Sequence, residues 1–211
     1  MSNPLSLPAR LCLLAWDSTE TDVTGAGRLP ALVRAGALVE LARRGLLVDE
    51  DGIVTPADLD SETGDPVLDG LLELVRESRP HRWGTWVTLR ARITLDAVRE
   101  QLAAGGHLHA EKRRVLGVFP TVEYALEGGA VVDALREEAR AVVLGPVAVA
   151  EVSERDAALA ALADAAGLVS DDEHDRGRLE ELVERGGAAA PVLRTVLREV
   201  RTAGSAASAV N

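Results

Sequence analysis

Basic side chains are unevenly distributed along this sequence, and they are its clearest indication of binding chemistry. Between Arg76 and Arg114, nine basic residues stand against four acidic ones, although the whole 211-residue chain has a net charge of −11. Guanidinium and ammonium groups at this density favour binding of a phosphate or another anion. The segment therefore predicts an anion-binding surface on an acidic protein. The alternative, that these residues form ordinary solvated helix faces, stays open.

Two further groups of side chains are of types that ligate metal ions. His107, His109 and Glu111 are spaced at i, i+2 and i+4, and residues 171–175 read DDEHD. An i, i+2 pair points to one side only on a strand, and it still lacks the third and fourth ligands that a tetrahedral zinc site needs. We therefore predict no metal site and no cofactor.

Motifs for covalent or nucleotide chemistry are missing from the sequence. It has no G-x-S-x-G nucleophile motif, no Walker loop and no G-x-G-x-x-G dinucleotide motif. Cys12 is the single cysteine, has no histidine near it in the sequence and is flanked by apolar residues, which indicates a buried core thiol. We expect that the protein is not an enzyme.

The elements that position these residues are predicted to be helices. Hydrophobic residues make up 47% of the chain and aromatic residues only 2%, so the core must consist mainly of Leu, Val and Ala. Gly45, Gly106 and Gly167 each close a Leu/Ala-rich amphipathic run, as expected of a left-handed residue after a helix. The fold class predicted is mainly α.

Two segments predict β-hairpins. Alternating apolar and polar residues predict a prominent hairpin near residues 114–126, and Asp51-Gly52 predicts the turn of a shorter one. Together with the helices, this pattern predicts a single helical domain over residues 1–203 with a protruding β-hairpin, followed by a flexible tail at residues 204–211. The apolar run before Asp17 is too short for a membrane span or signal sequence, so we expect a cytoplasmic protein.

A second hypothesis is a winged-helix-like regulator that binds nucleic acid. A helix that ends at Gly45 and is followed directly by a hairpin has the elements of a winged-helix domain. A DNA-binding wing should be basic, however, whereas this turn carries Asp49, Glu50 and Asp51. We therefore expect no nucleic-acid partner.

Three motifs in order resemble a known family. The runs RAGALVELARRGLL (residues 34–47), TGDPVLD (63–69) and EKRRVLGVFP (111–120) resemble the Golgi phosphoprotein 3 family, from about Leu11 to the C-terminal helices. That family also has bacterial members, and the composition, rich in Ala, Arg, Gly and Val, resembles that of an actinobacterial protein. The resemblance implies a Golgi-phosphoprotein-like helical domain with a hairpin.

The resemblance also implies a function. Eukaryotic members of the family are peripheral membrane adaptors that bind the headgroup of phosphatidylinositol 4-phosphate and the cytosolic tails of glycosyltransferases. The phosphate pocket in those members uses a tryptophan before the R-x-G helix, the arginine that opens this helix, and an R-x-x-R pair on a later helix. Arg34 matches the helix-opening arginine, and Arg92 matches the first of the pair. Gly25 replaces the tryptophan and Leu95 the second arginine, with Arg90 and Arg99 nearby as substitutes.

Structural roles compete with binding for several of these residues. Arg34 can instead form an ion pair with Glu40, Asp65 or Asp69, and the Thr63-Gly64-Asp65 motif suits a helix cap. Trp83 and Trp86, three residues apart, fit core packing better than anchoring at a membrane interface.

The sequence therefore predicts a non-enzymatic binding or adaptor module. Its ligand-binding residues are predicted to be Arg34, Arg90 and Arg92, and its partner an anionic phospholipid headgroup or another phosphorylated ligand. The apolar hairpin predicts a homo-oligomer or contact with a membrane, and the location expected is the cytoplasm, at the inner face of the membrane. A protein-interaction subunit without lipid function is the third hypothesis.

Overall fold

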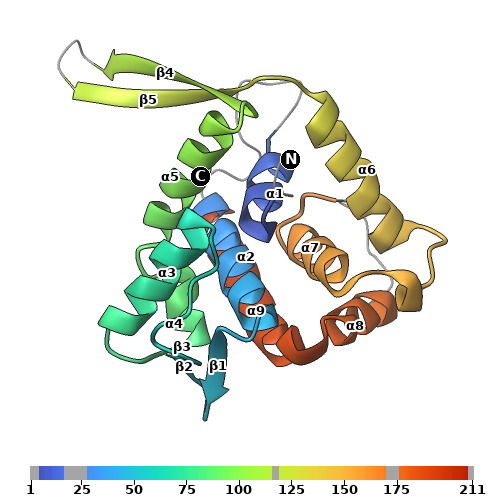
Figure 1. The fold of residues 1–211 in the computed structure, drawn as a ribbon. Coiled ribbons are helices and arrows are strands. Elements are labelled where there is room, and N and C mark those ends of the chain that lie inside the picture. The colour runs from blue at the N-terminus through green and yellow to red at the C-terminus, as the bar shows by residue number, and fades with distance from the viewer. Residues whose placement is uncertain (1–4, 17–27, 116–118, 170–175, 209–211) are drawn as a thin grey trace.

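The computed structural model describes residues 5–16, 28–115, 119–169 and 176–208. The fold is mainly helical, as predicted, and the described part also has two small antiparallel sheets, one of three strands and one of two (Figure 1). The helices of the described part are α1 (Leu7–Leu14), α2 (Leu29–Arg43), α3 (Pro66–Glu77), α4 (Trp83–Thr88), α5 (Ala91–Ala104), α6 (Ala130–Leu144), α7 (Glu154–Ala165), α8 (Arg176–Arg185) and α9 (Ala190–Ser208), with single 3-10 turns η1 (Val149–Glu151) and η2 (Gly187–Ala189). The strands are β1 (Leu47–Glu50), β2 (Ile53–Pro56), β3 (His81–Arg82), β4 (Leu108–Val115) and β5 (Phe119–Leu126).

Helix α2 lies at the centre of the molecule. Every residue from Ala31 to Leu41 is buried, and the helix packs against α1, α4, α5, α7 and α9. Its small residues allow close packing: a Cβ on Gly36 would lie 2.5 Å from Leu11 Cδ1 and 3.3 Å from the Cα of Pro8, both on α1. A helix that is buried around its whole circumference lies inside the core of a fold. Because α2 is packed on all sides, it provides a rigid base for the side chains that it carries.

The predicted helix ends are confirmed. Gly45, Gly106 and Gly167 have φ values of 71°, 73° and 71°. After α2, the Gly45 amide donates to the Ala42 carbonyl and the Leu46 amide donates to the Leu41 carbonyl. This is the Schellman arrangement, which requires a left-handed residue.

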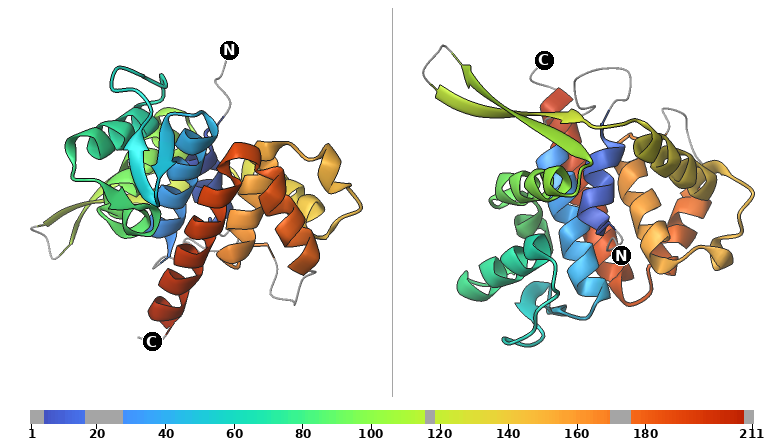
Figure 2. Two further views of the ribbon diagram at one scale, coloured as in Figure 1. Left: turned by 90° about the horizontal axis from the view of Figure 1, so that it is seen from below. Right: turned by 45° about the horizontal axis from the view of Figure 1, so that its top comes forward.

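Both predicted hairpins are present, with one difference in length. Strands β4 and β5 pair from Leu108↔Leu126 to Val115↔Phe119, so the long hairpin begins before the predicted residue 114. It extends away from the helical body in both views of Figure 2, and its residues 116–118 lie outside the described residues. The short hairpin turns at Asp51 and Gly52, whose φ values are 55° and 83°. Two positive φ values in succession are typical of a type I′ turn.

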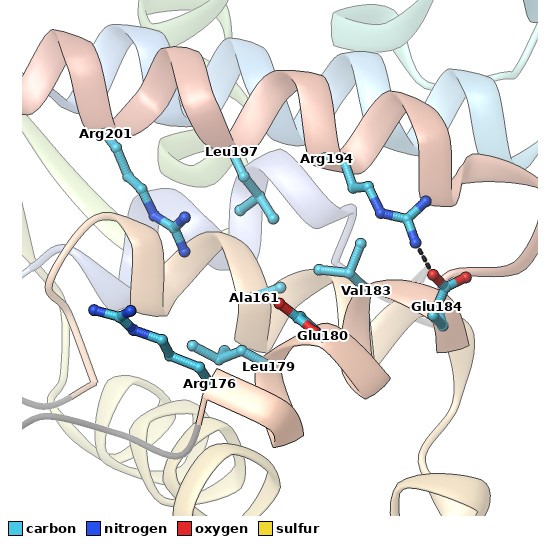
Figure 3. Close-up of a pocket in the computed structure, with 9 residues that line it drawn as sticks. All are labelled: Ala161, Arg176, Leu179, Glu180, Val183, Glu184, Arg194, Leu197 and Arg201. Atoms are coloured by element: carbon cyan, nitrogen blue, oxygen red, sulfur yellow. Dashed lines mark ion pairs between the residues drawn. The ribbon is translucent and has the colours of Figure 1, made fainter.

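The C-terminal helices α7, α8 and α9 surround a pocket of about 660 Å³ (Figure 3). Helix α9 packs along α2, α4 and α7, and it runs to Ser208. The sequence predicts a flexible tail at residues 204–211, but the backbone is helical at residues 204–208. Residues 209–211 lie outside the described part.

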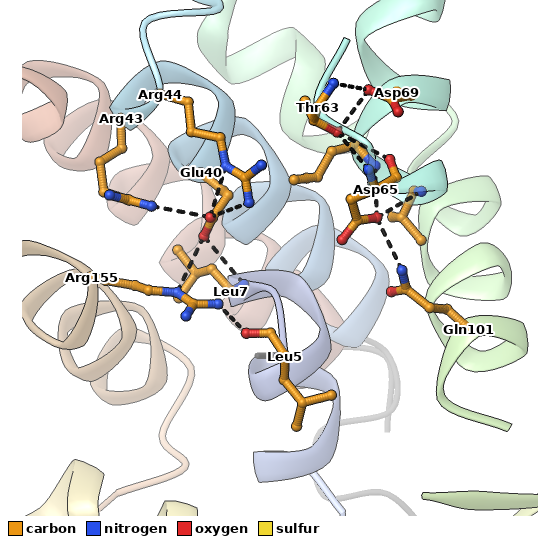
Figure 4. Close-up of polar contacts among 12 residues, drawn as sticks. Leu5, Leu7, Glu40, Arg43, Arg44, Thr63, Asp65, Asp69, Gln101 and Arg155 are labelled. Atoms are coloured by element: carbon orange, nitrogen blue, oxygen red, sulfur yellow. Dashed lines mark hydrogen bonds and ion pairs between the residues drawn. The ribbon is translucent and has the colours of Figure 1, made fainter. Parts of the chain in front are cut away.

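The Thr63-Gly64-Asp65 motif caps α3, as its residue types suggested (Figure 4). Asp65 Oδ1 accepts hydrogen bonds from the amides of Val67 (2.9 Å) and Leu68 (3.4 Å). Asp69 Oδ1 accepts from the Thr63 amide (2.6 Å) and hydroxyl (2.7 Å). This motif therefore stabilises the fold, and its side chains are occupied by the chain itself.

The tryptophans on α4 are core residues, as the sequence favoured. Trp83 is 2% exposed and Trp86 is fully buried. Trp83 Nε1 donates to Asp49 Oδ2 at 2.6 Å, which ties α4 to β1. Cys12 is also buried, and burial raises the pKa of its thiol to about 12, so it is not a reactive thiolate at neutral pH.

Candidate functional site

Arg34 is the predicted site residue that the structure places most deeply. The resemblance predicts that Arg34 is the first residue of its helix. Helix α2 begins at Leu29 instead, so Arg34 lies more than one turn inside the helix. Its side chain has no exposed surface. Arg34 Nε donates to Thr94 Oγ1 (2.7 Å), and Arg34 Nη2 donates to the Arg90 carbonyl (2.8 Å). The guanidinium thus joins the centre of α2 to the start of α5.

The positive charge of Arg34 has no acidic partner among the described residues. The alternative prediction of an ion pair with Glu40, Asp65 or Asp69 is wrong. Glu40 pairs with Arg43 and Arg44, and the two aspartates accept hydrogen bonds at the cap of α3. Burial lowers the pKa of Arg34 to about 10, so the group stays charged at neutral pH. A buried charge without a counter-charge is costly.

One nitrogen of the same guanidinium is unsatisfied. Arg34 Nη1 is buried and has no hydrogen-bond partner in the described structure. Buried polar groups in folded proteins almost always have a partner, and each exception calls for an explanation. A buried donor that carries positive charge is suited to a negatively charged oxygen.

Arg90 and Arg92 lie at the start of α5, where the Arg90 carbonyl contacts the Arg34 guanidinium. Arg90 precedes the helix with a φ of 52°, in the left-handed region that a bulky residue rarely adopts. It offers Arg34 its backbone carbonyl, while its side chain is exposed. The Arg92 side chain is also exposed, and neither arginine forms an ion pair among the described residues. The start of α5 therefore carries two exposed arginines, and its backbone is held by the buried guanidinium of Arg34.

Two residues at this location were missed by sequence reasoning. Thr94 is 5% exposed and holds Arg34 in place. A signal for it existed, because a threonine interrupts the apolar stripe of Ala91, Leu95 and Val98 on α5. Ile93 is 58% exposed, directly after Arg92.

Two further residues were considered for the family pocket, Gly25 and Arg99. Gly25, at the tryptophan position, lies outside the described residues. Arg99 lies over the ring of Tyr124 on β5, with 5.7 Å from its guanidinium carbon to the ring centre. It therefore packs against the base of the long hairpin, and no contact joins it to Arg34.

Glu40, six residues further along α2, is a second buried charge (Figure 4). Its Oε1 accepts from Arg44 Nη2 (2.8 Å) and Arg43 Nη2 (3.2 Å), and its Oε2 lies 3.6 Å from Arg155 Nε. Burial raises the pKa of Glu40, but the hydrogen bond from Arg44 and the charges of Arg155 and Arg43 outweigh it, so the pKa lies below its ordinary value. Arg43 and Arg44 are thus engaged away from the Arg34 site.

Glu40 also binds the beginning of α1. Its Oε2 accepts from the Leu7 amide (3.3 Å), an amide of the first turn, where a helix has no internal acceptor. Arg155 donates to the Leu5 carbonyl. This cluster joins α1, α2 and α7, and its role is structural.

The other sequence candidates give no assembled site in the described part of the chain. No three metal-ligating side chains converge there, and residues 171–175 lie outside it. At the short hairpin, Asp49 accepts from the Gly52 amide and from Trp83, while Glu50 and Asp51 are exposed. Within the described ranges, no helix is both long enough and apolar enough to cross a bilayer.

Two comparisons with known proteins complete these observations. The family model described as Golgi phosphoprotein 3 (GPP34) matches residues 7–200, which is most of the chain and includes α2, α5 and both hairpins. A comparison with curated protein sequences gave no match.

Proposed function

Because this chain belongs to the Golgi phosphoprotein 3 (GPP34) family, we propose that it is a binding module for the phosphate of an anionic lipid headgroup at the junction of α2 and α5. The family is non-enzymatic, and membership is compatible with a lipid-binding or adaptor role. The finer assignment, to Arg34, Arg90 and Arg92, is our proposal.

The observation that carries the proposal is the buried Arg34 charge with its unsatisfied Nη1. In this proposal, Arg90 and Arg92 contact the phosphate, because their guanidinium groups are exposed. Arg34 positions them by holding the Arg90 carbonyl and with it the strained backbone at the start of α5. A phosphate oxygen that displaces the groups covering Arg34 would meet Nη1 as a charged donor.

Ile93 supports a membrane surface as the source of the phosphate. It is exposed in the first turn of α5, one residue from Arg92 and three from Arg90. An apolar side chain among cationic ones is suited to the interface of an anionic bilayer. The apolar side chain can enter the boundary of the acyl region, while the cationic groups stay among the headgroups. Such peripheral binding would place the protein at the cytoplasmic, inner face of a membrane.

The long hairpin belongs to the same proposal as a contact for a second copy of the chain. Val122 on β5 is 44% exposed, and an isolated two-stranded ribbon is only marginally stable in water. If the wild type sediments as a monomer and deletion of residues 113–121 leaves its sedimentation unchanged, hairpin-mediated assembly is excluded.

A protein-interaction role without lipid is the outcome if all lipid assays fail.

Vesicle flotation tests the lipid proposal. The wild type, Arg90→Gln, Arg92→Gln and the control Arg79→Gln are mixed with vesicles of phosphatidylcholine alone, with added phosphatidylglycerol, or with added phosphatidylinositol 4-phosphate. Arg79 is an exposed arginine of the same basic segment, outside α5. We expect flotation with anionic vesicles that decreases with salt, and weaker flotation of Arg90→Gln and Arg92→Gln only.

The outcomes separate the hypotheses. Equal flotation with both anionic lipids would mean general anion binding, and preference for the phosphomonoester would support a phosphate pocket. Equal losses for Arg79→Gln and Arg92→Gln would replace the site with a diffuse basic surface. Absence of flotation at low ionic strength would reject lipid binding.

A further inference from the structure

The junction between α4 and α5, formed by Leu89 and Arg90, lies against the buried guanidinium of Arg34. Arg34 Nη2 donates to the Arg90 carbonyl at 2.8 Å. The same carbonyl accepts from the amide of Ile93, in the first turn of α5, at 3.0 Å. Because Arg34 has no exposed surface, a ligand can contact it only after a covering group has moved. The Arg90 carbonyl is one of the two groups that hold this guanidinium.

The helices on both sides of the junction are anchored in the core. Trp86 on α4 is fully buried, Leu95 on α5 is 2% exposed, and both helices pack against α2. In the junction itself, Leu89 is half-buried and Arg90 is exposed. A segment with little buried surface can change conformation at much lower cost than the helices that it joins. The junction is therefore the part of this site that can move.

Two local costs coincide at the contact between Arg34 and Arg90. Arg90 has a φ of 52°, and the left-handed region is unfavourable for every residue except glycine. Arg34 Nη1 is buried and has no partner in the described structure. Strained backbone of this kind is typical of ligand sites and switch regions. One event would remove both costs: Arg90 returns to a negative φ, and an anionic oxygen reaches Nη1.

A change at Arg90 must also alter its contact with Arg34. Because α4 and α5 are anchored, a return to negative φ re-aims the peptide groups on either side of Arg90, and its carbonyl belongs to one of them. The conformation of this one residue therefore controls access to the guanidinium.

We propose that the junction of Leu89 and Arg90 is a two-state hinge, closed in this structure, that opens when a phosphate binds Arg34. This inference rests on the proposed function. In the closed state, Arg34 holds Arg90 and Arg92 for the first contact with the phosphate. In the open state, the Arg90 carbonyl leaves Nη2 and phosphate oxygens contact the Arg34 guanidinium. The apparent affinity is then lowered in proportion to the fraction of open molecules.

A matched pair of variants, Arg90→Gly and Arg90→Ala, tests the hinge. Both lack the exposed guanidinium, so they differ only in the cost of the left-handed backbone. Glycine adopts this conformation readily, whereas alanine retains the strain of the wild type. Arg90→Gly should therefore favour the closed state about fivefold to thirtyfold more than Arg90→Ala does.

Amide hydrogen exchange of the full chain measures this shift without lipid. The Ile93 amide reports on the Arg90 carbonyl, and the amide of Leu38, at the centre of α2, reports on global unfolding. The Ile93 amide should exchange faster than the Leu38 amide, because the hinge opens locally. It should exchange about fivefold to thirtyfold more slowly in Arg90→Gly than in Arg90→Ala.

The same pair of substitutions at Asp96 is the control. Asp96 is exposed and lies within α5, where the backbone is helical. Glycine weakens a helix relative to alanine. The order should therefore reverse, with faster exchange of the Ile93 amide in Asp96→Gly than in Asp96→Ala.

Vesicle flotation tests whether the open state is the one that binds. With vesicles that contain phosphatidylinositol 4-phosphate, Arg90→Ala should bind about fivefold to thirtyfold more tightly than Arg90→Gly. Stronger binding of Arg90→Gly would overturn the proposal, because the closed state would then be the binding state.

The exchange experiment separates this proposal from the proposed function. Equal exchange of the Ile93 amide in the two Arg90 variants, or exchange no faster than that of Leu38, would overturn the hinge even if the wild type binds vesicles. If the exchange rates follow the expected order and the wild type does not bind vesicles, the local opening is supported and the lipid function is rejected.

Discussion

Helix α2 carries two buried charges six residues apart, and only one of them is surrounded by groups of opposite charge. Glu40 is surrounded by Arg43, Arg44 and Arg155, whereas Arg34 has a hydroxyl, a carbonyl and one unsatisfied nitrogen. Both charges avoid water, with 1% and 0% exposure. A buried charge with ample counter-charge stabilises structure, whereas one without it retains capacity for a ligand. The difference leads us to assign stability to Glu40 and binding to Arg34.

The largest effect is expected for Glu40→Ala. Three arginines and the Leu7 amide would lose their common acceptor, and removal of one partner from a buried ionic cluster costs about 3–5 kcal/mol. Urea unfolding measures the change in the free energy of unfolding. Glu73→Ala, at an exposed position on α3, is the control and should lie within about 0.5 kcal/mol of the wild type. A loss as small as the control's would end the structural assignment of Glu40.

Acid should weaken the same cluster. The pKa of Glu40 in the folded protein lies below its ordinary value of 4.5, so the folded state binds the proton less readily than the unfolded state does. Its contribution to stability is complete above about pH 4.5 and is lost as the pH falls towards the folded pKa. Urea titrations of wild type and Glu40→Gln at a series of pH values should converge below pH 4.5. Parallel curves through that range would contradict the assignment.

The substitution Arg34→Met removes the buried positive charge but keeps the length of the side chain. The variant loses two hydrogen bonds and also an uncompensated buried cation, so we expect a loss of about 1–3 kcal/mol in stability, less than for Glu40→Ala. Flotation with anionic vesicles should nevertheless decrease about tenfold. Unchanged flotation by a folded Arg34→Met protein would remove Arg34 from the site.

Thr94→Val tests whether Arg34 acts through its position. Valine has the shape of threonine without the acceptor for Arg34 Nε, and the lost hydrogen bond should cost about 0.5–1.5 kcal/mol. Vesicle binding should weaken together with stability, and Thr94→Ser should restore both. Restoration of stability without restoration of binding would show that the orientation of Arg34 is irrelevant to the ligand.

The smallest effect is expected for the exposed arginine on α5. Arg92→Ala should weaken flotation about two- to fivefold, the range of an exposed charge contact, and leave the unfolding midpoint unchanged. Arg43→Ala is the matched opposite: it should lower stability through Glu40 and leave flotation unchanged. Equal effects of both substitutions on flotation would abolish the distinction between the two regions of α2.

The local features of this protein follow from its residue types and their spacing. Gly45 ends α2 because the following turn needs a left-handed residue, Asp51-Gly52 makes the turn of the short hairpin, and Asp65 caps α3. Each depends on residues within one or two turns, so residue type and spacing suffice to predict it. The helical class followed similarly from a core with few aromatic residues.

The surroundings of each buried charge, in contrast, depend on how distant helices pack. Arg34 contacts Thr94, which lies sixty residues away in the sequence, and Glu40 contacts Arg155 from α7. The sequence marked Arg34 for its charge, but its burial and its unsatisfied nitrogen arise where α5 crosses α2. The free energy of a charge depends on the dielectric and the partners around it, and distant segments supply both when the chain folds.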